Sequence, residues 1–352
     1  MMADDAPGRE RLNYLWQNGT DFLGCPFAIL GGAMTWVSER NLVSSISNAG
    51  GFGVLACGSM TTELLAVEIK ATKALTTRPF GVNLIVMHPD LADLIDVCID
   101  HDISHIVLAG GLPSKATIAA AKAGGAKLLS FAPSLGVAKK LVRAGADALI
   151  IEGMEAGGHI GPVATTVLAQ EILPTMSETM PEIPIFLAGG IGHGEALAAY
   201  LNMGAAGIQM GTRFVCATES VAHANFKKAF LRGHARDALP SVQMDPEFKV
   251  IPVRALANDA TKAFTQTQID VIARYRAGET TFEEASLAIE HFWAGALKRA
   301  AIDGDVENGS LMAGQSVGLV KKEEPVADIL SELVSQASAA LARDQATMGA
   351  VA

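Results

Sequence analysis

Three polar side chains lie within or at the ends of short apolar runs that are typical of buried strands. Asn83 lies near the end of 81–84, Ser130 lies inside 128–131, and Glu152 ends 148–152. A polar group in such surroundings needs a partner, and an amide can both donate and accept hydrogen bonds. We predict that Asn83 and Glu152 contact a cofactor and that Ser130 faces the same site. The alternatives are a loop cap for Asn83, a backbone-bonded hydroxyl for Ser130 and a salt bridge at the rim for Glu152.

A histidine among glycines follows Glu152, in the segment Glu155-Ala156-Gly157-Gly158-His159-Ile160-Gly161. Glycine leaves the backbone free of bulk, so that a substrate can approach the imidazole closely. Histidine titrates near neutral pH and suits general acid or base catalysis. His193 is a weaker candidate. The other histidines lack metal-ligand spacing, and we predict no metal site.

Glycine-rich turns end the last two apolar runs. One reads Ala188-Gly189-Gly190-Ile191-Gly192, and the other reads Gln209-Met210-Gly211-Thr212-Arg213. Such turns expose backbone N–H groups, and the start of a following helix favours an anion. The two turns predict a phosphate site, with tight packing of the glycines as the alternative.

The segments that position these residues alternate between short apolar strands and longer helical patterns. Eight strands joined by helices pair in parallel, and eight such units predict a closed TIM (β/α)8 barrel. A doubly wound sheet is the alternative, but no G-x-G-x-x-G turn follows the first strand. The strands are expected at 27–31, 53–56, 79–84, 105–108, 127–131, 148–152, 184–188 and 207–210, with helices at 38–48, 61–76, 89–101, 114–123, 134–144, 163–173, 194–203 and 219–230.

The alternation stops near residue 230, where Pro240, Pro246 and Pro252 break the chain. Two amphipathic helices are expected at 260–277 and 281–300, and a last helix at 325–343. We therefore predict a barrel over 1–229, a small helical subdomain over 230–303 and a C-terminal segment, 304–352, that returns to the barrel.

Composition excludes several classes of function. The formal net charge is −10, with no cluster of lysine and arginine between aromatics, which argues against a nucleic-acid partner. No apolar run is long enough to cross a membrane, and the first 20 residues do not form a signal peptide. The four cysteines are scattered along the sequence, and we expect them to be reduced thiols in the core of a cytoplasmic protein.

Taken together, the motifs resemble the nitronate monooxygenase family, formerly called 2-nitropropane dioxygenases, and its flavin-dependent enoyl-acyl-carrier-protein reductase relatives. The similarity covers about 26–326. The motifs that carry it are Gly31-Gly32-Ala33-Met34, Ser47-Asn48-Ala49-Gly50-Gly51, Gly81-Val82-Asn83-Leu84, Glu152–His159, Ala188-Gly189-Gly190-Ile191, Gln209–Phe214 and Ala313-Gly314-Gln315-Ser316.

The resemblance implies a barrel that binds FMN without a covalent bond. His159 matches the catalytic histidine of the family. The residues implied to surround the flavin are Gly32, Ala33 and Met34 along the ring, Asn83, Ser130 and Glu152 at the ring or ribityl chain, and Gly189, Gly190, Gln209, Met210, Gly211 and Thr212 toward the phosphate.

The activity implied is oxidation of alkyl nitronates or nitroalkanes with O₂ to carbonyl compounds and nitrite. Ile160-Gly161 after the histidine is similar to the reductases, so an NAD(P)H-dependent reductase of enoyl thioesters or quinones is the alternative. A barrel of the inosine-monophosphate dehydrogenase type would need a cysteine in the loop that carries His159. A non-enzymatic binding protein would purify colourless. The sequence leaves a homodimer open.

Overall fold

The computed structural model describes residues 8–248 and 250–351 and contains an eight-stranded parallel barrel. This confirms the predicted fold class. The strands are short and buried, as expected where helices cover the outside of a parallel sheet. They are β1 (Ile29–Gly31), β2 (Gly53–Ala56), β3 (Phe80–Ile85), β4 (His105–Ala109), β5 (Lys127–Phe131), β6 (Ala148–Glu152), β8 (Ile185–Ala188) and β9 (Gly207–Met210).

The barrel closes between its first two strands. Around the sheet the order is β1, β9, β8, β6, β5, β4, β3, β2, and a parallel bridge joins Leu30 to Phe52 just before β2. Gly31 N donates to Phe52 O at 2.9 Å, and Phe52 N donates to Ile29 O at 2.9 Å. Closure brings the carboxyl ends of all eight strands to one mouth.

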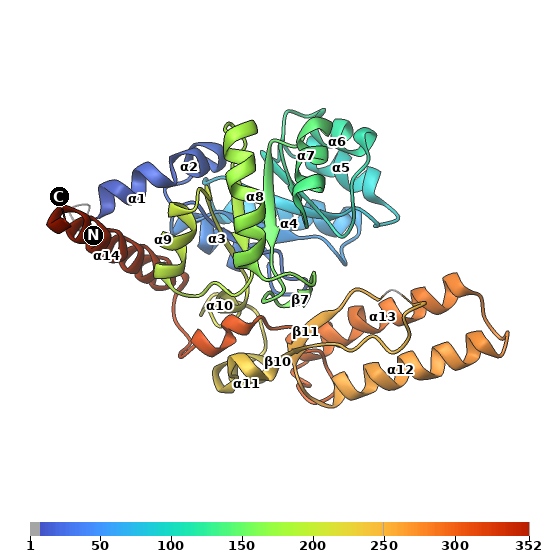
Figure 1. Cartoon of the computed structure of the whole chain (residues 1–352). Helices are drawn as coiled ribbons and strands as arrows, with labels where there is room; N and C mark the ends of the chain where they lie inside the picture. Colours follow the sequence, from blue (N-terminus) through green and yellow to red (C-terminus); the bar gives the residue numbers. More distant parts are fainter. Residues whose placement is uncertain (1–7, 249, 352) are drawn as a thin grey trace.

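Helices alternate with the strands and cover the outside (Figure 1). Several begin at a hydroxyl cap, such as Ser114 and Ser134, whose Oγ atoms accept from the N–H groups of Thr117 and Val137. The outer helices are α3 (Arg40–Asn48), α4 (Thr62–Leu75), α5 (Leu91–Asp100), α6 (Lys115–Lys122), α7 (Leu135–Ala144), α8 (Thr165–Thr179) and α9 (Gly194–Asn202). The short α10 (Thr212–Val215) and α11 (Ala224–Arg232) follow β9 and lie below the barrel in Figure 1.

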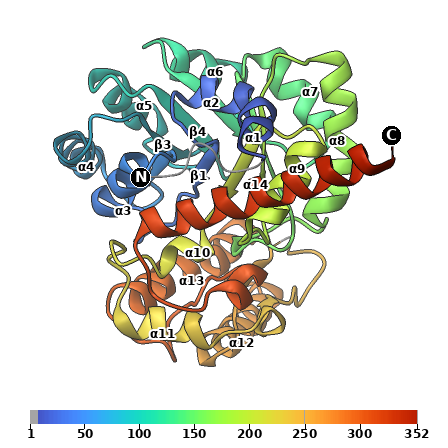
Figure 2. The same ribbon diagram turned by 90° about the vertical axis from the view of Figure 1, so that its left-hand side faces the viewer.

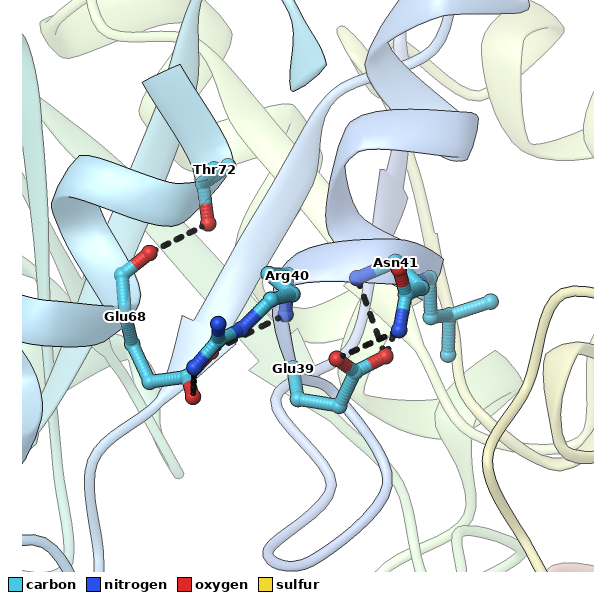
Figure 3. A network of polar contacts seen from close by, with 6 residues as sticks. Glu39, Arg40, Asn41, Glu68 and Thr72 are labelled. Carbon is cyan, nitrogen blue, oxygen red and sulfur yellow. Dashed lines mark hydrogen bonds and ion pairs between the residues drawn. The ribbon is translucent and has the colours of Figure 1, made fainter. Parts of the chain in front are cut away.

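A polar network fixes α3 against α4 (Figure 3). The Glu39 carboxylate caps α3 and accepts from Asn41 N at 2.9 Å and Leu42 N at 3.2 Å. Arg40 Nε donates to Glu68 Oε2 of α4 at 3.0 Å. The network holds the first helices of the barrel wall beside the loop that leaves β1.

Of the two N-terminal helices, α1 (Arg9–Leu15) packs against α14 and α9, and α2 (Gln17–Leu23) closes the barrel at the end opposite the mouth. The ring of Phe22 meets His105, at the start of β4, edge to face at 5.3 Å, and His105 Nε2 lies 3.0 Å from Phe22 O. Burial lowers the pKa of His105 to about 4. This histidine is therefore neutral near pH 7 and belongs to the packing of the barrel floor.

The last helix, α14 (Val326–Val351), returns to the barrel wall and packs against α9, α1 and α3 (Figure 2). Among the described residues, no helix is long and apolar enough to span a membrane.

The segment after α11 forms a second body below the mouth (Figure 1). Helices α12 (Asp259–Arg276) and α13 (Phe282–Ala301) form an antiparallel pair with its own core, in which the rings of Phe264 and Trp293 lie 4.2 Å apart. We expected helices alone here. The structure adds an antiparallel sheet of β10 (Ala238–Pro240), β11 (Val253–Leu256) and β7 (Gly158–His159), and the last of these belongs to the barrel loop after β6.

Candidate active site

The pairing register decides which strand residues face the barrel interior. Residues paired directly across a sheet share a face, and the faces alternate along each strand. Val82 and Leu108 belong to an apolar cluster with helix residues, so they face outward. Asn83 pairs with Val107 and therefore faces inward. Its side chain is 6% exposed and makes no hydrogen bond with the described residues.

Glu152 and Gln209 also face the interior. Glu152 pairs with Ala188, which pairs with Gln209, so the three lie at one level of the mouth. Along this row the backbones of Glu152 and Gln209 are two strand spacings apart, and one spacing is about 4.8 Å. Neither side chain hydrogen-bonds to a described residue, and Gln209 is only 8% exposed. The mouth thus gathers three polar side chains that the rest of the described chain does not satisfy.

Two predicted contacts need correction. Ser130 pairs with the outward-facing Leu108, which places its hydroxyl among the outer helices rather than at the mouth. Met210 pairs with Gly31, where an added Cβ would meet Ile46 of α3, so this side chain also faces outward. The sequence pattern does not show which face of the sheet these side chains occupy, because apolar residues occur on both faces of a buried parallel strand.

His159 lies on β7, in the loop that follows β6, and β11 pairs with this short strand. Val253 pairs with His159 and Arg254 pairs with Gly158. Ile160 N continues the pairing by donating to Pro252 O at 2.9 Å. Gly158 has φ +80°, a conformation that suits glycine. The exposed imidazole therefore belongs to a loop of the barrel, but a strand of the second body positions that loop.

The first glycine turn is built around Thr165, the buried first residue of α8. Thr165 Oγ1 lies 3.0 Å from the Glu155 carboxylate, 3.1 Å from Ala188 O and 3.2 Å from Gly189 O. Gly189 and Gly190 have φ of +99° and +72°. Their N–H groups donate to no other described residue. This turn offers backbone donors of the kind that bind a phosphate.

The turns after β1 and β9 meet at Gly211. Gly32 N donates to Met210 O at 2.7 Å, and a Cβ on Gly211 would lie 3.3 Å from Met34 Sδ. Thr212 Oγ1 accepts from Gly314 N at 2.9 Å, so the C-terminal segment completes the turn after β9. The structure thus brings 32–34, 189–190 and 209–212 to the same mouth.

A strained tryptophan links the loop after β1 to α13. Trp36 has φ +68°, which is costly for a bulky residue. Lys298 Nζ lies 5.2 Å from its ring centroid, within the range of a cation–π contact. The second body therefore contacts the barrel at the loop after β1 as well as at β7.

Arg254 is a site residue that our sequence reasoning missed. It is 2% exposed, its Nε donates to Met154 O at 2.8 Å, and its Nη1 donates to Ala238 O. The only sequence signal is a single charge inside the apolar stretch 253–256. Elsewhere, a surface hollow of about 380 Å³, lined in part by Arg232, Arg236 and Leu239, shares no residue with the mouth.

The cysteines do not contribute nucleophiles. All four, Cys25, Cys57, Cys98 and Cys216, are buried and unpaired, and burial raises the pKa of each thiol to about 12. A thiol with so high a pKa is protonated at neutral pH and is a weak nucleophile.

The family follows from comparison with known proteins. The model of the family described as nitronate monooxygenase matches residues 17–101 and 93–336. The chain belongs to the nitronate monooxygenase family. It is 31% identical to the Mycobacterium tuberculosis protein named (3aS,4S,5R,7aS)-5-hydroxy-7a-methyl-1-oxo-octahydro-1H-indene-4-carboxyl-CoA dehydrogenase, over 90% of this chain and 95% of that protein.

Two further proteins are similar to this chain over most of its length. A nitronate monooxygenase of Paraburkholderia phytofirmans is 27% identical, over 88% of this chain and 92% of that protein. The solved structure of FabK from Thermotoga maritima is 33% identical, with a TM-score of 0.80, and the alignment covers 93% of this chain and 98% of that one. Membership makes this chain a flavin oxidoreductase of the nitronate monooxygenase family.

The mouth fits the flavin that the family implies. Buried polar groups in proteins almost always have hydrogen-bond partners. The side chains of the buried Asn83 and Gln209 and of the half-buried Glu152 have none among the described residues. Their amides and carboxyl group match the donors and acceptors on the edge of a flavin ring. The N–H groups of Gly189 and Gly190 match its phosphate. The residues present therefore suit both ends of the cofactor.

The Glu152 carboxyl has an unusual affinity for protons. Burial raises its pKa from the ordinary 4.5 to about 8. Between these two values the folded, flavin-free chain holds a proton that the unfolded chain has released. Glu152 therefore contributes stability that is complete below about pH 4.5 and is lost as the pH rises through 8.

Glu152→Gln should flatten this pH dependence in the flavin-free protein, because glutamine does not titrate. The urea midpoint of the wild type should fall more steeply than that of the variant between pH 5 and 9. Glu182→Gln, at an exposed position, is the control and should follow the wild type. Parallel curves for all three proteins would contradict the shifted pKa.

Ser130→Ala should leave flavin affinity unchanged and should stabilise the fold by about 1 kcal/mol. The buried Ser130 Oγ has no hydrogen-bond partner, and an orphaned buried hydroxyl costs roughly 1–3 kcal/mol. Ser47→Ala is the matched control and should destabilise, because Ser47 Oγ donates to Pro79 O and accepts from Gly53 N. Weaker flavin binding by Ser130→Ala would instead support the cofactor contact that the sequence predicted for Ser130.

Proposed function

We propose that this protein is an FMN-dependent oxidoreductase of acyl thioesters. In the oxidising direction, the carbon next to the thioester carbonyl loses a proton and the following carbon loses a hydride, which leaves a double bond. In the reducing direction, both return. The observation that carries the proposal is the set of unpartnered polar side chains, Asn83, Glu152 and Gln209, at the barrel mouth. A histidine lies on the loop that follows β6.

The bound flavin would supply hydride exchange, and the chain would supply binding and proton transfer. Asn83, Glu152 and Gln209 would hold the ring and ribityl chain, and the turn at Gly189 and Gly190 would hold the phosphate. His159 would take the proton from the carbon next to the carbonyl, or return it. A thioester carbonyl makes that C–H acidic, so an imidazole suits the transfer near neutral pH.

Similarity supports a thioester substrate. The 31% identical relative is named as a dehydrogenase of a carboxyl-CoA compound, whereas the nitronate monooxygenase relative is 27% identical. This reverses the order of preference that the sequence motifs gave. NADH or NADPH would supply electrons in the reducing direction, and we propose a small-molecule substrate with no nucleic-acid partner.

Nitronate oxidation is the second candidate, because the family model itself carries that name. The same histidine would remove the acidic proton of a nitroalkane, and O₂ would be the final electron acceptor. Carbonyl compounds and nitrite would be the products.

Anaerobic mixing of the purified yellow protein with single reagents separates the candidates. We expect NADH or NADPH to bleach the flavin absorbance and crotonyl-CoA to restore it. Bleaching by propyl-2-nitronate, with no response to either nicotinamide, would support the second candidate instead. A colourless protein that fails to bind added FMN would contradict both.

A further inference from the structure

The loop that carries His159 is held by a buried cation from another part of the chain. Arg254 of β11 is only 2% exposed. Its guanidinium donates to two backbone carbonyls, Met154 O of the loop at 2.8 Å and Ala238 O of β10. In the same strand, the Arg254 backbone pairs with Gly158, next to His159. One residue thus fixes the loop at both its start and its catalytic end.

Contacts of Glu155 and Gly157 restrict the rest of the loop as well. The Glu155 carboxylate accepts from Thr165 N at 2.9 Å, and Glu155 O accepts from Gln315 N at 2.9 Å. Gly157 passes so close to Gly314 that an added Cβ would lie 2.5 Å from Gly314 N. These contacts tie the loop to α8 and to the C-terminal segment, and Arg254 ties it to the small sheet.

Burying a guanidinium is costly, so its retention here needs a reason. Burial lowers the pKa of Arg254, and the field of Glu155 opposes that change. An apolar side chain would fill the same space, but it would leave the carbonyls of Met154 and Ala238 without their donor. The planar fork of arginine meets two carbonyls that point from different strands, a geometry that the single ammonium of lysine does not reproduce.

We propose that Arg254 is a positioning residue for His159, which sets the imidazole against the barrel mouth without touching the substrate. This rests on the proposed role of His159 in proton transfer. Small displacements of a reacting group reduce rates severely, by about 100-fold for an error of 1 Å. The guanidinium therefore matters for rate more than for cofactor binding.

A second buried arginine provides a matched control. Arg213 is 6% exposed and donates to Gly192 O at 2.9 Å, to Glu324 at 3.2 Å and to Glu332. It holds the turns after β8 and β9, on the phosphate side of the mouth. Both arginines are buried, but Arg213 binds two carboxylates as well as a carbonyl, whereas Arg254 binds carbonyls. They support different parts of the site.

The test compares flavin-loaded Arg254→Lys with Arg213→Lys by amide hydrogen exchange and FMN affinity. Arg254→Lys should speed exchange over 153–161 at least tenfold, change the NMR pH titration of the His159 ring and leave the Kd for FMN within twofold of the wild type. Arg213→Lys should do the reverse, with weaker FMN binding and unchanged exchange over 153–161. Turnover of crotonyl-CoA with NADPH should fall about 10- to 100-fold in Arg254→Lys.

The inference is overturned if Arg254→Lys leaves both loop exchange and the His159 titration unchanged, or if the two variants lose FMN affinity and exchange protection equally. If Arg254→Lys does not fold, Ser241→Ala is a gentler probe, because Ser241 Oγ accepts from Val253 N at 3.0 Å. It should loosen 153–161 to a smaller degree, and no change there would also overturn the inference. If crotonyl-CoA and NADPH do not react with the wild type, the proposed function fails, while exchange and titration still decide the role of Arg254.

Discussion

His159→Asn should slow turnover of the thioester by about 100- to 10,000-fold, the usual contribution of a general acid or base. Asparagine is similar in size but cannot carry the proton. The backbone pairing of His159 with Val253 does not depend on the side chain, so the loop should keep its place. The measurement is the kcat for crotonyl-CoA with NADPH, together with the Kd for FMN, which should not change.

His193→Asn is the control for this prediction. His193 Nδ1 accepts from Glu195 N at 3.3 Å as the cap of α9, and asparagine is a good cap, so the same substitution there should preserve turnover. For the second candidate function, His159→Asn should impair neutral nitroalkanes more than preformed nitronates. Equal losses on both would exclude His159 as the base.

Gly189→Ala should weaken FMN binding at least tenfold and destabilise the fold by more than the conformational penalty alone. Gly189 has φ +99°, and an added Cβ would lie 2.9 Å from both Gly153 O and Thr165 Oγ1. A left-handed backbone costs a non-glycine residue roughly 1–2 kcal/mol. The clash would also move the turn whose N–H groups face the proposed phosphate site.

Gly204→Ala separates these two effects. Gly204 has φ +100°, nearly the same as Gly189, but no atom lies within 4 Å of the added Cβ. This variant should show the conformational penalty in urea unfolding and bind FMN normally. If Gly189→Ala matches it in both measurements, the turn at Gly189 does not hold the phosphate.

The barrel could be predicted from sequence because each strand is a local signal. Buried parallel strands occur in the sequence as short apolar runs. The helices between them begin at recognisable capping residues and space their apolar residues with the period of a helix. The same burial hides which face of a strand points inward. Asn83 and Ser130 both interrupt apolar runs, yet the register places one inside the barrel and the other among the helices.

The small sheet could not be predicted because its signals are not local. β7 is two residues long, with a glycine and a histidine, and its partner β11 lies in the segment broken by prolines. β11 packs into the core of the second body through Val253, and this packing holds it beside the loop. Arg254 was missed for the same reason, since its partners Met154 and Ala238 are distant in sequence.

The return of α14 to the barrel has a consequence for the order of events during synthesis. Arg213 binds Glu324 and Glu332, and Gly194 N donates to Gln336 Oε1 at 2.8 Å. These partners follow the turns that they brace by more than a hundred residues in the sequence. During synthesis the eight barrel strands are therefore complete before α14 exists to brace these turns, and we expect stable flavin binding only after α14 has docked.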